Sequence, residues 1–176
     1  EDLLRLALMS SENRAAHALG RSFPGGVQIF VAAMNRKARE LGMTDTRFAD
    51  PTGLSSGNQS SARDLAVLVK ASSANDLIRS LTTSPVHHVA VGARDLRHRN
   101  SNRLVFSPQG SISLQQTGYI REAGRCVVMQ AQLADRHVIM VLLDATGPET
   151  RIADAERLRR WITGDDSPAT FLPPPI

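Results

Sequence analysis

Residues 111–145, SISLQQTGYIREAGRCVVMQAQLADRHVIMVLLDA, decide the class of fold. Three extended segments are predicted within this stretch: Ser111 to Thr117, Arg125 to Leu133 and His137 to Ala145. The last two are rich in Val, Met and Leu and flank the turn Ala134-Asp135-Arg136, which is typical of a β-hairpin. The stretch therefore predicts three antiparallel strands.

Helical patterns lie on both sides of these strands. Downstream, Pro148 occupies a first-turn position, and the apolar residues that follow it face one way: Ile152, Ala155, Leu158 and Ile162. Upstream, apolar residues recur at helical spacing over residues 25–41, and Gly42 follows as a stop. Further short helices are expected at four places, namely Leu3 to Met9, after Asn13, after a capping box of Ser61 with Asp64, and over Leu77 to Leu81.

These patterns predict an α+β protein, with a helical lobe followed by three antiparallel strands and a C-terminal helix. We expect a helical lobe over residues 1–105, strands and a covering helix over 106–163, and a proline-rich tail over 164–176, with polar loop at 98–110. Three strands backed by one helix leave an open edge and an uncovered face. We therefore expect an upstream fragment or another chain to complete the fold.

Composition narrows the classes of protein. The chain has 176 residues, 41% of them hydrophobic, which is enough for a core. The longest aliphatic run, Val138 to Leu143, is far shorter than the roughly 20 residues that span a bilayer, so no transmembrane segment is expected. Glu1 stands where a start methionine would, and we expect an internal piece of a longer precursor. Cys126 is the single cysteine, which excludes an internal disulfide.

The basic residues do not indicate nucleic-acid binding. The 21 Lys and Arg exceed the 17 Asp and Glu by a net charge of only +4. Arg94, Arg97, Arg99 and Arg103 form the densest basic region, but no aromatic residues alternate with them, and the whole chain is 4% aromatic. We interpret them as a solvated surface.

Two further patterns are interpreted as structural. Gly53-Leu54-Ser55-Ser56-Gly57 fits Gly-x-Ser-x-Gly, but Asp50-Pro51-Thr52 precedes it where a nucleophile elbow needs a buried strand, so we predict a turn. His87, His88 and His98 have no paired Cys or carboxylate at metal-ligand spacing and are interpreted as solvent-exposed loop histidines. No metal and no cofactor are expected.

Two short motifs carry the chemistry. Ser11-Glu12-Asn13 reads Ser-x-Asn between two helical patterns, and Gln116-Thr117-Gly118 closes the first predicted strand. Taken alone, Ser-x-Asn is more typical of a helix cap. Its surroundings, however, contain a series of short segments that match the sequence pattern of one known family, in the same order along the chain. They are Met9 to Ala16, Met34-Asn35, Leu41-Gly42-Met43, Thr46-Arg47-Phe48, Pro51 to Leu54, Ser61 to Leu65, Arg99 to Asn102 with Leu104, Thr117-Gly118-Tyr119, Ala123-Gly124 and Cys126.

Together, over residues 1 to about 163, these segments resemble the serine D-alanyl-D-alanine carboxypeptidases and endopeptidases of peptidase family S11, the low-molecular-mass penicillin-binding proteins. The resemblance implies part of a β-lactamase-like D,D-peptidase (transpeptidase-like) fold and a periplasmic or extracytoplasmic location. It also implies an acyl-serine mechanism on the stem peptides of peptidoglycan, the cell-wall polymer.

The resemblance assigns roles to the two motifs. Ser11 is the proton-relay hydroxyl and Asn13 the amide that positions lysine and substrate, while Thr117 holds the substrate carboxylate and Gly118 permits close approach. Gln116 stands where the family has the lysine of Lys-Thr-Gly.

A neutral amide at that position removes a charge-assisted contact worth about 1.5–3 kcal/mol. Arg99 is therefore a further substrate-binding candidate, and Arg121 is another arginine that would restore the positive charge.

The third family motif, Ser-x-x-Lys, is not in this sequence. The chain has two lysines, Lys37 and Lys70. The residues three positions before them are Met34 and Val67, neither of which is a serine. The resemblance places that motif upstream of Ser11, so this chain alone is predicted to be inactive, and β-lactams are expected to react only where the nucleophile segment is present. The alternative is a non-catalytic relative, a pseudoenzyme that binds peptidoglycan or a partner protein through the same groove.

Overall fold

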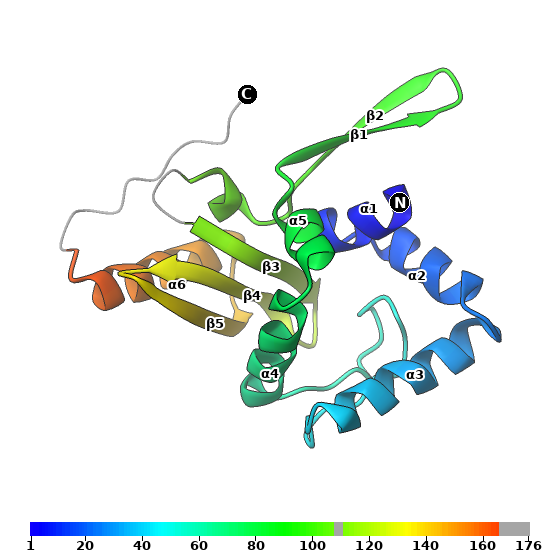
Figure 1. The fold of residues 1–176 in the computed structure, drawn as a ribbon, viewed down its shortest axis with the longest axis horizontal. Coiled ribbons are helices and arrows are strands. Elements are labelled where there is room, and N and C mark those ends of the chain that lie inside the picture. The colour runs from blue at the N-terminus through cyan, green and yellow to red at the C-terminus, as the bar shows by residue number, and fades with distance from the viewer. Residues whose placement is uncertain (108–110, 166–176) are drawn as a thin grey trace.

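A computed structural model of the chain describes residues 1–107 and 111–165 (Figure 1). The helices run in the order α1 (Asp2–Ser10), α2 (Asn13–Ser22), α3 (Gly26–Glu40), α4 (Ala62–Ser73), α5 (Asp76–Thr83), the 3-10 helix η1 (Arg103–Phe106) and α6 (Pro148–Thr163). The strands are β1 (Val86–Val91), β2 (Arg94–Arg99), β3 (Ser111–Ile120), β4 (Gly124–Leu133) and β5 (Arg136–Ala145). The expected α+β arrangement of helices followed by antiparallel strands and a last helix is confirmed.

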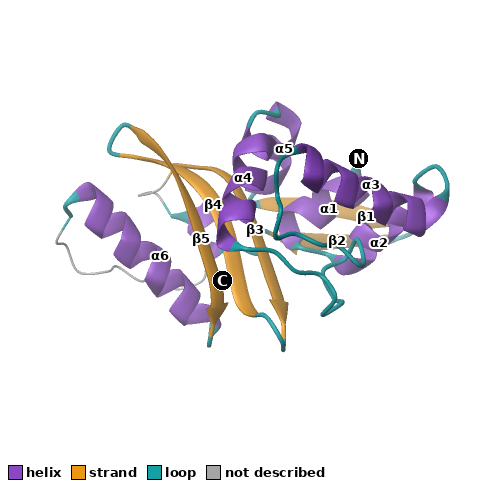
Figure 2. Ribbon diagram, turned by 90° about the horizontal axis from the view of Figure 1, so that it is seen from below, coloured by secondary structure: helices purple, strands orange, loops and turns teal. Residues whose placement is uncertain are grey.

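The three predicted strands form one antiparallel sheet with the order β3-β4-β5. Helix α6 lies against one face of this sheet, and α4 and α5 lie on the side of the other face, as Figure 2 shows. The expectation of an uncovered face was wrong, because helices that precede the strands in sequence pack on it. Met129, Ala131 and Leu133 alternate along β4 and form a buried cluster with Met140 of β5 and Ala155 of α6. Alternate side chains of a strand point to the same face of a sheet. On β4 the side chains that face α6 are apolar, so every second residue is buried.

The predicted apolar face of α6 is confirmed. Ile152 and Ala155 are buried, and Leu158 and Ile162 pack against the same core cluster. Gly164 ends the helix in the left-handed conformation with φ 68°, a usual C-terminal cap. Of the expected tail, residues 166–176 lie outside the described residues.

The capping box predicted for α4 forms only in part. Ser61 Oγ accepts from the backbone N–H of Asp64 at 3.2 Å, as expected. The Asp64 carboxylate, however, accepts from Asp45 N at 2.8 Å and from Thr46 Oγ1 at 2.7 Å. Asp64 is 2% exposed and ties the loop before α4 to the first turn of the helix.

The expectation of a polar loop over residues 98–110 was wrong for most of its described part. β1 and β2 pair from Val86 with Arg99 to Val91 with Arg94, and η1 follows after Asn102. The histidines interpreted as loop residues therefore lie on strands. Residues 108–110 lie outside the described residues. Within the described residues, no helix combines the length and apolar content needed to cross a membrane.

Candidate active site

Ser11 lies at the sharp junction between α1 and α2. It is the C-terminal cap of α1, with φ 54° and ψ 38°, in the left-handed region that costs a residue with a side chain roughly 1–2 kcal/mol. Such strain is typical of positions where a side chain is held for a function. The junction carries Ser11 Oγ to the edge strand β3, where it donates to the carbonyl oxygen of Thr117 at 2.8 Å.

Three hydroxyl groups from distant parts of the chain meet at this point. Ser11 Oγ lies 3.0 Å from Thr117 Oγ1 and 3.2 Å from Ser101 Oγ. Thr117 Oγ1 donates to Ser101 Oγ at 2.7 Å, and Ser101 Oγ donates in turn to the carbonyl of Met9 at 3.2 Å. Because each hydroxyl can donate and accept, a chain of hydroxyls at these distances can pass a proton.

Gln116 joins the same cluster from β3. Its Nε2 donates to Ser11 Oγ at 3.2 Å and to the carbonyl of Ala7 at 3.3 Å. Both amide protons are thereby used, and the buried Oε1 has no hydrogen-bond partner among the described residues. The structure thus brings the candidate residues Ser11, Gln116 and Thr117 together, and Gln116 uses both donors within the chain.

Ser101 is the residue of this cluster that the sequence did not mark as functional. Buried asparagines hold it on both sides: Asn100 Nδ2 donates to the carbonyls of Thr82 and Ser84 at 2.9 Å each, and Asn102, fully buried, caps η1. The only sequence signal was the Asn-Ser-Asn pattern, because side chains of this type fix turns by bonding to nearby backbone.

Asn13 is the first residue of α2 and is half-buried, two positions after Ser11. Between them, Glu12 caps α2, and its carboxylate receives Arg14 Nε at 2.8 Å and Nη2 at 3.0 Å. These bonds lower the pKa of Glu12 to about 2. The Glu12 cap and its pair with Arg14 stabilise the start of α2, the helix that begins with Asn13.

Gly118 leaves space along the outer edge of β3. β3 is an edge strand in the described sheet, and a Cβ added at Gly118 would meet nothing within 4 Å. An extended peptide can pair with such an edge through its backbone.

The two arginine candidates lie at or just after the ends of strands. Arg99 ends β2, where its carbonyl accepts from Ser10 Oγ at 3.0 Å and its guanidinium stacks 5.2 Å from the ring centre of Phe106. Arg121 lies exposed in the turn after β3.

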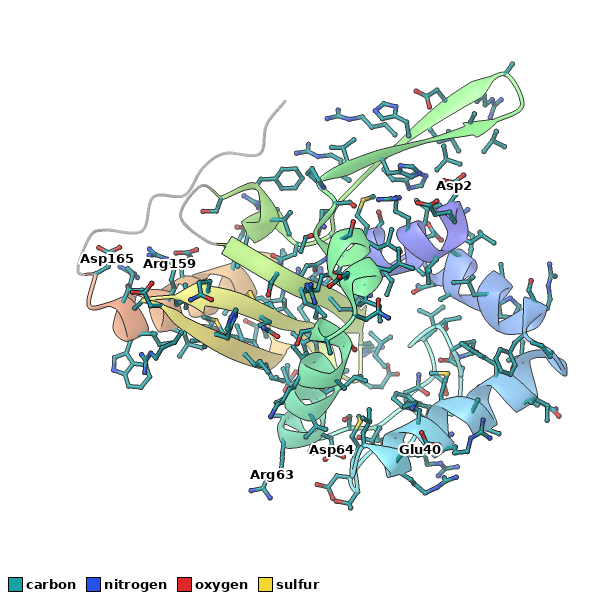
Figure 3. The ribbon with its side chains drawn as sticks, in the orientation of Figure 1. Asp2, Glu40, Arg63, Asp64, Arg159 and Asp165 are labelled. Carbon is teal, nitrogen blue, oxygen red and sulfur yellow. The ribbon has the colours of Figure 1, made fainter. Side chains whose placement is uncertain are left out.

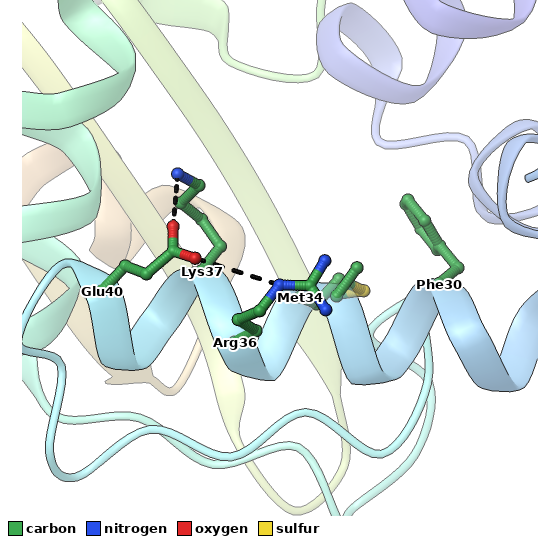
Figure 4. Close-up of a pocket in the computed structure, with 6 residues that line it drawn as sticks. Phe30, Met34, Arg36, Lys37 and Glu40 are labelled. Atoms are coloured by element: carbon green, nitrogen blue, oxygen red, sulfur yellow. Dashed lines mark ion pairs between the residues drawn. The ribbon is translucent and has the colours of Figure 1, made fainter.

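Neither lysine of the chain belongs to this site. Lys37 lies on α3, in a shallow hollow lined only by residues of that helix, and its Nζ pairs with Glu40 at 2.7 Å (Figure 4). Arg36 approaches the same carboxylate at 3.9 Å. Lys70 lies in the last turn of α4. The described residues also contain no group of His, Cys, Asp or Glu placed to hold a metal ion.

The fold and the hydroxyl cluster define a class, the penicillin-binding D,D-peptidase fold. The Streptomyces K15 DD-transpeptidase aligns with a TM-score of 0.84 at 26% identity, over 91% of this chain and 66% of that one. Penicillin-binding protein D2 from Listeria monocytogenes, solved with cefotaxime bound, aligns with a TM-score of 0.77 at 31% identity, over 89% of this chain and 63% of that one.

Within this class, the family description "D-alanyl-D-alanine carboxypeptidase" of peptidase family S11 matches residues 1–147. The D-alanyl-D-alanine endopeptidase of Escherichia coli K12 is 46% identical over 164 residues, and that of Pseudomonas aeruginosa PAO1 is 48% identical over 163 residues. Each alignment covers 92% of this chain and 53% of the relative, so the chain spans about half the length of these relatives. The chain belongs to the S11 family of D-alanyl-D-alanine peptidases.

Proposed function

We propose that this chain is the relay and substrate-binding part of a serine-type D-Ala-D-Ala endopeptidase or carboxypeptidase that acts on peptidoglycan stem peptides outside the cytoplasm. The observation that carries the proposal is the contact of Ser11 Oγ with Gln116 Nε2 at 3.2 Å and with Thr117 Oγ1 at 3.0 Å. Two family motifs separated by more than a hundred residues meet there at hydrogen-bond distance. A helix cap alone would need neither contact.

The proposed reaction needs a nucleophile that an upstream Ser-x-x-Lys segment supplies. Its serine hydroxyl gives its proton to the lysine of the same segment and attacks the carbonyl carbon of the D-alanine on the N-terminal side of the bond. The bond to the leaving amine breaks, and an acyl-serine ester forms. Ser11 Oγ passes a proton to the leaving amine, drawing on the hydroxyls of Thr117 and Ser101 beside it. Water then hydrolyses the ester and restores the serine.

The edge of β3 holds the substrate in this proposal. The peptide lies along β3 beside Gly118, its terminal carboxylate near Thr117 and Gln116, and Asn13 positions the lysine of the upstream segment and the substrate. β-Lactams react with the same nucleophile. Arg99 remains a proposed carboxylate ligand, for which its guanidinium would have to leave the Phe106 ring.

A second candidate function rests on Gln116. With both amide protons bonded within the chain, Gln116 offers no charge and no free donor to a carboxylate. A non-catalytic relative that binds peptidoglycan peptides or a partner protein through the edge of β3 fits this observation too.

The test restores the upstream part. A chimera joins the portion of the Escherichia coli relative that lies before the aligned region, carrying the Ser-x-x-Lys segment that the family resemblance implies, to Glu1 of this chain. We expect acylation by a fluorescent penicillin and cleavage of a D-Ala-D-Ala peptide, while the 176-residue chain alone stays unlabelled.

Two serine variants of the chimera decide the role of the site. Ser11→Ala removes the relay and should reduce turnover by about 100-fold or more, within the range for general acid–base groups. Ser22→Ala, an exposed serine at the end of α2, is the matched control and should leave turnover unchanged. Full turnover in Ser11→Ala would refute the relay, and peptide binding without acylation of the chimera would favour the non-catalytic relative.

A further inference from the structure

The hairpin of β1 and β2, residues 86–99, projects from the body of the molecule, away from the sheet and its helices (Figure 1). Its base is fixed to the start of α1, because His87 Nε2 lies 2.8 Å from Asp2 Oδ1, and Asn100 N donates to the carbonyl of Pro85 at 2.9 Å. Figure 3 shows Asp2 beside the base of the hairpin. The proposed catalytic chemistry gives this element no role.

One face of the hairpin is apolar toward its tip. Val91 is 54% exposed and Leu96 is 43% exposed. Val89 pairs with Leu96 and Val91 pairs with Arg94, and directly paired residues of antiparallel strands point to the same face. A protruding element therefore presents valine and leucine to solvent beside an arginine.

The same hairpin is basic. It carries three arginines and three histidines against a single acidic residue, Asp95. Arg94 and Arg97 are exposed, whereas the Asp95 carboxylate is already engaged by His88 Nδ1 at 2.7 Å. Arg94 lies on the face of Val91 and Leu96, whereas Arg97 pairs with His88 and lies on the opposite face. Both faces near the tip thus carry an exposed arginine, with little negative charge to offset it.

We propose that residues 86–99 form a membrane-association element that docks on a bilayer containing anionic phospholipid. Val91 and Leu96 enter the headgroup region, and Arg94 and Arg97 contact the lipid phosphates. This combination of inserted apolar side chains and electrostatic attraction is how non-spanning segments bind the membrane surface, and a short element of this kind binds reversibly.

A bilayer fits the hairpin better than an anionic polymer does. A flat bilayer surface contacts the parts of a protein that protrude, as this hairpin does. Transfer of the exposed valine and leucine from water into the bilayer lowers the free energy. A single-stranded nucleic acid would use aromatic side chains for stacking, and residues 86–99 contain none.

The experiment is co-sedimentation of the chimera with vesicles, with its fold checked by circular dichroism. Vesicles of phosphatidylglycerol mixed with phosphatidylcholine should bind the chimera, and phosphatidylcholine alone should bind at least tenfold less. The double variants Arg94→Glu with Arg97→Glu, and Val91→Ser with Leu96→Ser, should each reduce binding at least tenfold. The control Arg21→Glu with Arg63→Glu reverses the same charge at two exposed sites outside the hairpin and should bind as the unchanged protein does.

Insertion is read separately by fluorescence. Trp161 is the only tryptophan of the 176 residues, so Val91→Trp in a Trp161→Phe background, with any tryptophan of the upstream portion also changed to Phe, places a single reporter at the tip. Its emission should shift to shorter wavelength with the anionic vesicles and stay unchanged with phosphatidylcholine. The proposal is overturned by the absence of a shift, by equal losses in the control variant, or by full binding of the Val91→Ser, Leu96→Ser variant, which would indicate a site for anionic polymers or free phosphate.

Discussion

Substitution of Gln116 tests directly whether this position holds the substrate carboxylate, as proposed. Lysine has three donors and a full charge, so Gln116→Lys can keep the bond to Ser11 Oγ and still offer a charge-assisted bond to a carboxylate. We expect acylation or turnover of the chimera to rise about ten- to hundred-fold. Gln28→Lys, at an exposed position of α3, makes the same chemical change away from the site and should have no effect. An unchanged rate for Gln116→Lys would place the carboxylate elsewhere, with Arg99 the next residue to substitute.

Glu12 gives the start of α2 a pH dependence. Folding lowers its pKa from 4.5 to about 2, so its ion pair with Arg14 stabilises the folded state above pH 4.5 and loses this effect as pH falls toward 2. Glu12→Gln keeps the oxygen that caps Arg14 N and removes the charge. Since Arg14 is 88% exposed, we expect a loss of only about 1 kcal/mol at neutral pH.

Chemical denaturation of the chimera checks this expectation. The difference between Glu12→Gln and the unchanged protein should shrink as the pH is lowered from about 5 to about 3. Glu122→Gln, exposed in the turn after β3, is the control with no expected change. A difference that is constant with pH would mean that the charge of Glu12 is not what stabilises the helix.

The sequence marked Ser11, Gln116 and Thr117 as candidates because their residue types form motifs, and the structure places them in contact. The sequence did not mark Ser101, which packing brings to the same point. Ser101 was missed because its role depends on where buried Asn100 and Asn102 place the turn, which is a tertiary fact. The assigned roles of these residues, and of Asn13, Gly118 and Arg99, stay predictions.

Among the elements, the turn between β3 and β4 has a strict requirement for glycine. Gly124 has φ 63°, and a Cβ there would lie 2.8 Å from the Cα of Asp144 on β5. Gly124→Ala should therefore cost more than 2 kcal/mol in the free energy of unfolding, about 1 for the left-handed backbone and the rest for the contact with fixed backbone atoms.

Gly92, in the turn of the β1–β2 hairpin, provides the matched comparison. Its φ is 60°, but a Cβ there would meet nothing within 4 Å, so Gly92→Ala should cost only about 1 kcal/mol. Denaturant unfolding of the two chimera variants measures the difference. Equal losses would show that the contact with Asp144 relaxes at little cost.

The β1–β2 hairpin is the longest part of the structure that sequence reasoning missed, and the reason is physical. Three of the six residues in β2 are arginines, and Arg94 and Asp95 at its start are exposed, so no core face imposes an alternating pattern on it. β4 and β5 and helix α6 were predictable because each buries an apolar face at its own period.

At the scale of the whole molecule, large apolar side chains remain uncovered. Leu143 on β5 is 41% exposed, Ile29 on α3 53% and Trp161 on α6 80%. In α1, Leu6 is buried, whereas Leu3 is 44% exposed. At about 25 cal/mol per Å², several hundred Å² of such surface amounts to roughly 10 kcal/mol, which is comparable to the stability of a domain.

We therefore expect residues 1–176 to need a covering fragment. Expressed alone, the chain should associate or unfold without a sharp transition, while the chimera unfolds cooperatively. Sedimentation and thermal unfolding measure both. A monomer of the chain alone with a cooperative transition above about 50 °C, normal for mesophile domains, would show that it is self-sufficient.

The contact of Ser11 with Thr117 also has a consequence for biosynthesis. The two residues are 106 apart in sequence, and closing a flexible loop of that length costs about 4 kcal/mol of chain entropy. This cost arises before the contact can stabilise the fold. Contacts of such long range slow folding, and synthesis from the N-terminus leaves Ser11 without its partner until β3 has been made. The hydroxyl proposed as the relay therefore meets its partner on β3 late, after the helices beside Ser11 have been made, so the proposed site is incomplete in a nascent chain.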